Sequence, residues 1–360
     1  MYKLKFRHFI FLLILESSIV NTTESSSSSR TLLYILVSVL LTLCCFVAVI
    51  IRLFILIIYL IKHKRPRHTS STETVPLLPI TSLHSKRLPH GLLRAAGDKN
   101  DPDISEMSYN SARDELFLAD HANRVVRAMR VHDNAGDLHD VYRAPLDTSN
   151  SLCGVCHMSG SDTLLVSSIE RGACWLVALS RNDSEWREAQ RVQTDGSGNI
   201  SCALSDSRVL IGQWNSTYME LFRVESGPRI ERVHRIHVPE EYKWFSATCG
   251  SDTLVAMSYA DKSVRVHRLR GDRLEELARI QLKAPNRLLW LADRLIVADS
   301  DEKSHAVIEL EVSDTRLERR RELIATSENI HVSSLCAVID GLAICDYTGI
   351  SKDILHYSFV

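Results

Sequence analysis

The chain has 360 residues, of which 45% are hydrophobic and 24% are charged, and its mean hydropathy is −0.04. This composition excludes a disordered protein, a collagen and a polytopic membrane protein. The net charge of −1 conceals an asymmetry, because residues 1–68 carry nine Lys or Arg and two acidic residues, and the remainder carries 34 basic and 42 acidic residues. Phosphate neutralisation requires a basic surface, so we do not expect the acidic remainder to bind nucleic acid.

The first apolar run, residues 9–15, follows three basic residues in the arrangement of a signal peptide. The small-residue cleavage site that should follow is indistinct. Residues 1–20 are therefore expected to be either a signal peptide or a short anchor. A serine-rich luminal stub at residues 21–30 separates this segment from a second apolar run.

The second apolar run predicts a transmembrane helix over residues 31–61. A helix needs about 20 apolar residues to cross the hydrocarbon core, and Arg52 is the one charge that interrupts this run. Four basic residues follow it directly, at Lys62, Lys64, Arg65 and Arg67. The positive-inside rule then places the chain beyond residue 62 in the cytosol. The opposite orientation is favoured by three glycosylation sequons, which begin at Asn182, Asn199 and Asn215.

Residues 62–103 hold five of the nine prolines and many Ser and Thr, which predicts a flexible tether. Within this tether, Glu73, Leu77 and Leu78 resemble the acidic dileucine signal that adaptor complexes recognise on cytosolic tails. The resemblance implies sorting to endosomal or lysosomal membranes. The alternative is that these residues belong to an ordinary linker.

Beyond residue 104, an apolar triplet recurs six times at intervals of 41 to 48 residues. The triplets begin at Leu116, Leu164, Val209, Leu254, Leu295 and Leu342, and an aspartate precedes each one. Short runs with period-2 alternation flank each triplet, so every repeat predicts about four short strands. This pattern is typical of a propeller blade. We predict an all-β, six-bladed β-propeller over residues 104–360, preceded by a single transmembrane helix and the tether.

The sixth repeat lacks a fourth strand, because the sequence ends at Val360 after the third. An unpaired strand edge would promote aggregation. We therefore expect residues 85–95 to supply the missing outer strand and close the ring.

The segment Asp114-Glu-Leu-Phe-Leu-Ala-Asp-His-Ala-Asn-Arg-Val-Val126 resembles an NHL repeat. The NHL pattern places Asp after an apolar run, here Asp120, and then Asn and Arg, here Asn123 and Arg124. The chain is one residue shorter than that pattern between Asp120 and Arg124, and the other repeats match it weakly. The resemblance implies a six-bladed NHL-like propeller within the superfamily of WD-repeat-like folds.

The sequence Cys153-Gly-Val-Cys156-His157 has the spacing of a haem attachment site. However, cysteines recur at equivalent places before three triplets, at Cys153, Cys202 and Cys336. Recurrence on inner strands indicates small buried core residues. We therefore expect no haem and no other resident cofactor, and free thiols in a reducing compartment.

Asn150, Asn199 and Asn286 fall at turns that enter the innermost strands, and an Asp follows two of them seven residues later. This spacing resembles that of the gluconolactonase and strictosidine-synthase-like propellers. The resemblance implies a calcium ion in the central channel, for which Glu106 is the one candidate acidic ligand. The glycine that follows Asn in those families is missing here, and asparagine at strand entries is also a common turn residue.

Nucleophile motifs such as G-x-S-x-G and H-E-x-x-H are absent from the sequence. We therefore expect a single-pass membrane protein whose cytosolic propeller is an interaction scaffold rather than an enzyme, with a protein partner bound on one face. The alternative is a calcium-dependent hydrolase or lyase that faces the lumen.

Overall fold

The computed structural model describes residues 83–88 and 93–359, apart from 94, 96–97, 133–137, 146–150, 171–172, 184, 196–197, 206, 214–216, 226, 228, 239–241, 252, 292, 301–304, 314–315, 325–330 and 347–353. These residues all belong to one compact unit, Ser70–Val360. Across this part of the chain, no helix has both the length and the apolar character that spanning a membrane requires. The expected signal peptide, transmembrane helix and dileucine motif lie outside the described residues.

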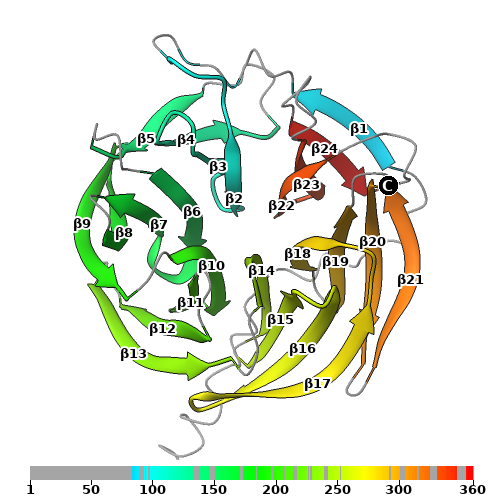
Figure 1. Ribbon diagram of the computed structural model, residues 1–360. Helices are drawn as coiled ribbons and strands as arrows, with labels where there is room; N and C mark the ends of the chain where they lie inside the picture. Colours follow the sequence, from blue (N-terminus) through cyan, green and yellow to red (C-terminus); the bar gives the residue numbers. More distant parts are fainter. Residues whose placement is uncertain are drawn as a thin grey trace, which may run out of the picture. The chain divides into compact units, whose positions relative to one another are not determined.

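The prediction of an all-β fold is confirmed, because the described strands form four four-stranded sheets and one eight-stranded sheet, arranged in a ring (Figure 1). The first sheet contains β2 (Ile104–Asn110), β3 (Glu115–Asp120), β4 (Val125–Arg130) and β5 (His139–Arg143). The second contains β6 (Ser151–Met158), β7 (Thr163–Glu170), β8 (Ala173–Asn182) and β9 (Glu185–Thr194), with a 3-10 turn (η2, Ser159–Ser161) between β6 and β7.

The eight-stranded sheet contains β10 (Gly198–Ser205), β11 (Arg208–Gln213), β12 (Tyr218–Glu225), β13 (Arg229–His237), β14 (Tyr242–Ser251), β15 (Leu254–Tyr259), β16 (Ser263–Arg270) and β17 (Arg273–Gln281). It consists of two antiparallel four-stranded halves, which one parallel bridge between His237 and Arg273 connects. The penultimate sheet contains β18 (Pro285–Leu291), β19 (Arg294–Ser300), β20 (His305–Val312) and β21 (Leu317–Ile324). The closing sheet contains β22 (Val332–Val338), β23 (Gly341–Asp346), β24 (Ile354–Phe359) and β1 (Leu83–Leu88).

The hydrophobic core lies between neighbouring sheets rather than at the centre of the ring. Each cluster of buried residues draws on two adjacent four-stranded units, for example Leu116 of β3 with Cys336 of β22 and Ile354 of β24. The middle strands are therefore covered on both faces, and every residue of β3 and β23 is buried. This packing explains why the apolar triplets are continuous and do not alternate.

Four of the aspartates that precede the triplets lie in described turns between the first and second strands of a sheet: Asp114, Asp162, Asp293 and Asp340. Asp114 and Asp162 adopt the left-handed conformation, with φ of 55° and 44°. Aspartate tolerates this conformation better than most residues, because its short polar side chain can hydrogen-bond to nearby backbone groups.

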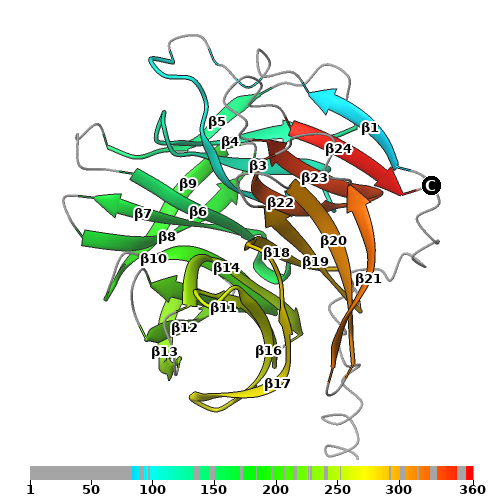
Figure 2. The same ribbon diagram turned by 45° about the vertical axis from the view of Figure 1, so that its right-hand side comes forward.

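Strand β1 closes the ring, because it pairs antiparallel with β24 in continuous register from Leu83–Phe359 to Leu88–Ile354. Figure 2 shows β1 alongside β24 at the outer edge of the closing sheet. The strand begins two residues before the segment expected from the sequence, 85–95, and ends within it. Beyond the strand, Leu93 packs into the core between the first and closing sheets.

A buried ion cluster around Arg127 of β4 holds the chain between β1 and β2. The Arg127 side chain is 1% exposed. Its Nη1 donates to Asp120 Oδ2 at 2.9 Å and to the Leu93 carbonyl at 3.0 Å. Its Nη2 donates to Asp98 Oδ1. Asp98 and Asp120 are equally enclosed, and Arg127 also reaches the more exposed Asp140 at 3.2 Å. A buried charge without such partners is strongly destabilising, so this cluster constrains the position of the incoming chain.

The residues that resemble an NHL repeat build this same region. Asp120 accepts hydrogen bonds from Asn123 Nδ2 at 2.9 Å and from the Asn123 and Asp103 backbone amides at 3.1 Å each. Arg124 adopts a left-handed conformation, with φ of 56°, in the turn between β3 and β4. These motif residues therefore form a turn and orient Asp120 toward Arg127.

Ring closure by β1 predicts that a chain lacking residues 1–88 aggregates and melts at a lower temperature than a chain lacking residues 1–69. The longer deletion removes β1 and exposes the edge of β24, whereas the control deletion keeps the whole compact unit. Size-exclusion chromatography and thermal unfolding measure the two effects. Equal elution profiles and melting temperatures would show that β1 is dispensable for closure.

Candidate functional site near the axis of the ring

The strands nearest the axis of the ring are β2, β6, β10, β14, β18 and β22 (Figure 1). Of the three asparagines predicted for a calcium site, Asn286 lies at the start of β18 and Asn199 lies in β10, whereas Asn150 lies outside the described residues. Asn286 Nδ2 donates to the Ser300 carbonyl of β19 at 3.0 Å. The Asn286 side chain thus joins two neighbouring strands, as a strand-entry residue would.

Glu106 of β2 occupies an enclosed position against β6. Its Oε2 is inaccessible to solvent and has no hydrogen-bond partner, while the carboxyl group accepts a hydrogen bond from the Val155 backbone. A Cβ atom at position 154 would lie 2.2 Å from Glu106 Oε2 and 2.9 Å from Ser167 Oγ. Gly154 is therefore required for the close approach of β2 to β6.

Burial raises the pKa of Glu106 from 4.5 to about 8, although the positive charge of Arg287 lowers it in part. Arg287 of β18 is itself enclosed, and burial lowers its pKa. Its Nη2 donates to the Ser105 carbonyl of β2 at 3.1 Å, so the side chain reaches past β22, which lies between β18 and β2 in the ring. Glu106 is consequently protonated near neutral pH, and the Arg287 guanidinium lies close enough to lower its pKa in part.

The thiols near Glu106 are poorly reactive. Burial, with a smaller contribution from the charge of Glu106, raises the pKa of both Cys153 and Cys336 to about 12. A thiolate is the form that attacks electrophiles and binds metals, so these side chains are suited to packing rather than chemistry. The six cysteines whose side chains the structure describes are all free thiols.

Trp290 makes a second close contact between inner strands. A Cβ atom at Gly250 of β14 would lie 2.1 Å from the Trp290 ring, and the Trp290 amide donates to Thr248 Oγ1 at 3.0 Å. Neither this contact nor the role of Gly154 is predicted by the motifs and repeats in the sequence. The available signal was a glycine within each strand pattern, which indicates a close approach of another chain segment.

The sequence matches no family model, and no curated protein sequence matches it. Solved structures share its fold: the apo form of the soluble aldose sugar dehydrogenase from Escherichia coli has a TM-score of 0.52 at 10% identity, over 78% of this chain and 100% of that chain. A chain of the mitotic checkpoint complex has a TM-score of 0.49 at 10% identity, over 76% and 95% of the two chains. U3-55K has a TM-score of 0.49 at 11% identity, over 71% and 80%.

The similarity to the sugar dehydrogenase identifies the ring of sheets as a β-propeller. At 10% identity it concerns the fold alone. The chemistry near the axis of the ring depends on this chain's own residues, Glu106 and Arg287 above all.

The raised pKa of Glu106 predicts a pH-dependent contribution to stability. The folded-state pKa of about 8 lies above the unfolded value of 4.5, so the unfolded chain releases this proton first and the folded state loses stability between about pH 4.5 and 8. Glu106→Gln removes this titration and should flatten the decline by about 1–3 kcal/mol, because the amide stays neutral throughout this pH range. Urea unfolding of both proteins across this pH range measures the difference; parallel pH profiles would contradict the assignment.

Proposed function

We propose that the protein is a six-bladed, NHL-like β-propeller that serves as a scaffold for a protein partner and is held at a membrane by residues 31–61. The blade count treats each half of the eight-stranded sheet as one blade, since a single parallel bridge connects the halves. The NHL-like assignment is supported by the structural use of Asp120 and Asn123 in the turn that orients Arg127.

The observation that carries the scaffold proposal is that side chains of the inner strands make contacts within the protein. Arg287 spans two blades to reach β2, Glu106 packs against Gly154, and Trp290 packs against Gly250. A substrate would need these groups to be accessible, and Glu106 Oε2 is not. Contacts between the inner strands of different sheets restrain the sheets relative to one another. A restrained ring is a suitable scaffold for surface loops that bind another protein.

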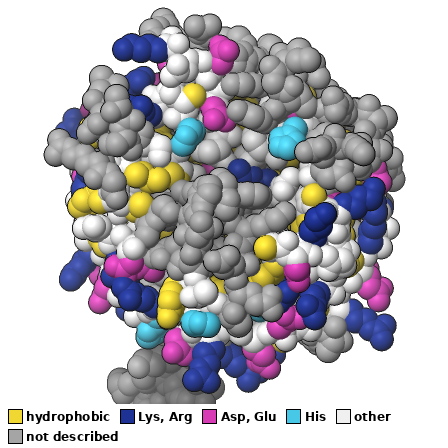
Figure 3. Space-filling view, viewed as in Figure 1, with side chains coloured by type: hydrophobic (Ala, Val, Ile, Leu, Met, Phe, Trp, Pro, Cys, Tyr) yellow, Lys and Arg dark blue, Asp and Glu magenta, His cyan; other side chains and the backbone are white. Residues whose placement is uncertain are grey.

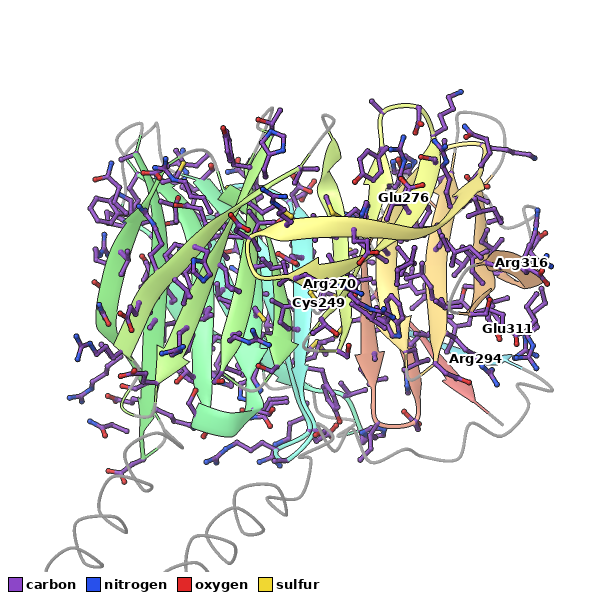
Figure 4. The ribbon with its side chains drawn as sticks, turned by 90° about the horizontal axis from the view of Figure 1, so that it is seen from below. Cys249, Arg270, Glu276, Arg294, Glu311 and Arg316 are labelled. Atoms are coloured by element: carbon purple, nitrogen blue, oxygen red, sulfur yellow. The ribbon has the colours of Figure 1, made fainter. Side chains whose placement is uncertain are left out.

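The outer surface favours a protein partner over nucleic acid. Side chains of both signs lie on it, among them Arg270, Glu276, Glu311 and Arg316 (Figure 4). Several of the exposed arginines are paired with glutamates, for example Arg319 with Glu322 at 3.1 Å and Arg270 with Glu275 at 3.0 Å. On the face in Figure 3, acidic side chains are interspersed with the basic ones around the rim, and no broad basic patch forms among the described residues.

The propeller is proposed to face the cytosol, with Glu73, Leu77 and Leu78 as a sorting signal for endosomal or lysosomal membranes. The basic residues after the apolar run support this orientation. The sequon at Asn182 provides the test, because this residue ends β8 at an exposed position and would accept a glycan in the lumen.

We expect glycosidase treatment of the protein from its native cells to leave its electrophoretic mobility unchanged. A C-terminal tag should also be digested by protease added to sealed microsomes. The Asn182→Gln variant is the matched control, because a mobility shift that disappears in this variant would place the propeller in the lumen and overturn the cytosolic scaffold.

The second candidate function is a calcium-dependent hydrolase or lyase that faces the lumen. The observation that favours it is the enclosed Glu106 Oε2, which lacks a hydrogen-bond partner near the axis of the ring. Against it, a neutral carboxyl group beside Arg287 is a weak partner for a divalent cation, which prefers several ionised or carbonyl oxygens.

Calcium binding separates the two candidates. A ligand that binds only the folded state at a hundredfold excess over its Kd adds about 2.7 kcal/mol of stability. We expect the same melting temperature in EDTA and in excess calcium, and we expect Asn286→Ala to cost about 0.5–1.5 kcal/mol equally in both through its lost hydrogen bond to Ser300. A calcium-dependent rise of several degrees that Asn286→Ala abolishes would favour the enzyme.

A further inference from the structure

Two histidines and an aspartate meet at the seam between the first and closing sheets. His132 follows β4 of the first sheet, Asp340 forms the turn between β22 and β23, and His356 lies in β24. Asp340 Oδ1 is 3.2 Å from His132 Nε2 and 2.9 Å from His356 Nε2. One potential ligand atom from each of the three residues lies within 4.8 Å of the other two.

These distances fit a tetrahedral metal ion. Zinc binds imidazole nitrogen and carboxylate oxygen at about 2.0 Å, which places neighbouring ligand atoms of a tetrahedron about 3.3 Å apart. The two measured separations are close to this value. Two imidazoles and one carboxylate are a donor set suited to zinc and similar transition metals, whereas calcium and magnesium prefer oxygen ligands.

The residues around the cluster are arranged as a metal site requires. His132 Nδ1 lies 2.7 Å from Asp114 Oδ1, so this carboxylate accepts the Nδ1 proton. In the metal-free cluster His132 Nε2 donates to Asp340, and a metal ion that binds here would displace that proton. Asp114 is itself held by Tyr109, whose hydroxyl donates to it at 2.8 Å. A carboxylate behind a ligating histidine is a common feature of zinc sites and raises the basicity of the ligand.

The cluster also combines access with anchoring. The side chains of His132 and Asp340 are each 41% exposed, so an ion can enter from solvent, whereas His356 is 8% exposed. The ligands are far apart in sequence but come from neighbouring sheets: His132 follows β4 of the first sheet, and Asp340 and His356 belong to the closing sheet. An ion bound here would therefore join the two sheets that close the ring.

We propose that His132, Asp340 and His356 bind one divalent transition-metal ion, such as Zn²⁺, across the closure seam, with Asp114 as the positioning residue for His132. Three protein ligands leave the fourth tetrahedral position to water or to a side chain of a bound partner. This site is independent of the proposed scaffold function and of the calcium alternative.

The test measures Zn²⁺ binding to the full-length protein, after EDTA treatment and removal of the chelator, by isothermal titration and by the shift in melting temperature. We expect His132→Gln, His356→Gln and Asp340→Asn each to weaken the tightest site at least tenfold, and Asp114→Asn about tenfold or more. His234→Gln is the matched control, since His234 is an exposed histidine on β13, away from the seam, and should bind Zn²⁺ like the wild type.

A second readout is the visible absorption of Co²⁺ bound in a tetrahedral nitrogen–oxygen site. The wild type and His234→Gln should show the band, and His132→Gln should lose it while keeping the native circular dichroism spectrum, because His132 is largely exposed. The proposal is overturned if the wild type binds no Zn²⁺, if no tetrahedral Co²⁺ band forms, or if His132→Gln binds both ions as the control does. Those results would mean that the three side chains form only a hydrogen-bonded cluster.

Discussion

A ring of sheets stays closed only when the two ends of the chain are joined. In this protein the pairing of β1, from the N-terminal side, with β24 in the closing sheet joins them. Without β1, the edge of β24 would present unpaired backbone groups to solvent. The pairing also determines where the following chain runs, because Leu93 and Asp98 must reach Arg127 a few residues later. The closure therefore combines backbone hydrogen bonds, apolar packing and a buried ion cluster in one region.

The rest of the molecule depends on this closure. Each core cluster lies between two neighbouring units, so an open ring would expose the cluster that the first and closing sheets share. The contacts between inner strands need the closed ring as well, since Arg287 of the penultimate sheet donates a hydrogen bond to Ser105 of the first sheet. The candidate metal site lies at the same seam, where His132 meets Asp340 and His356.

Features set by local sequence were predictable. The apolar triplets, the aspartate turns and the missing outer strand follow from alternation, turn chemistry and the need to cover a strand edge, and Asp114 and Asp162 adopt the expected tight-turn conformation. The NHL-like residues were recognised from their spacing. Their role in orienting Arg127 was not apparent, because Asp98 and Arg127 become neighbours only in the closed ring.

The sites themselves depend on contacts between distant repeats, and sequence spacing does not encode these. His132 and Asp340 are more than two hundred positions apart, yet they lie 3.2 Å from one another across the seam. The sequence offers Glu106 as a calcium ligand, but it does not show that Glu106 is buried near Arg287. That environment, which raises its pKa, depends on packing between β2, β6 and β18. A glycine within a strand, such as Gly154, indicates that another segment packs closely against it. It does not identify that segment, which here carries Glu106.

Hydrogen exchange of the β24 amides tests ring closure most directly. Successive amides of β24 point alternately toward β23 and β1, so pairing on both edges should protect Ile354 to Phe359 uniformly, to the level of β23. Strand β21, which pairs on one edge with β20, is the internal comparison. Closure by β1 predicts slow exchange throughout β24, whereas fast exchange at every second residue, as in an outer strand with one free edge, would contradict closure.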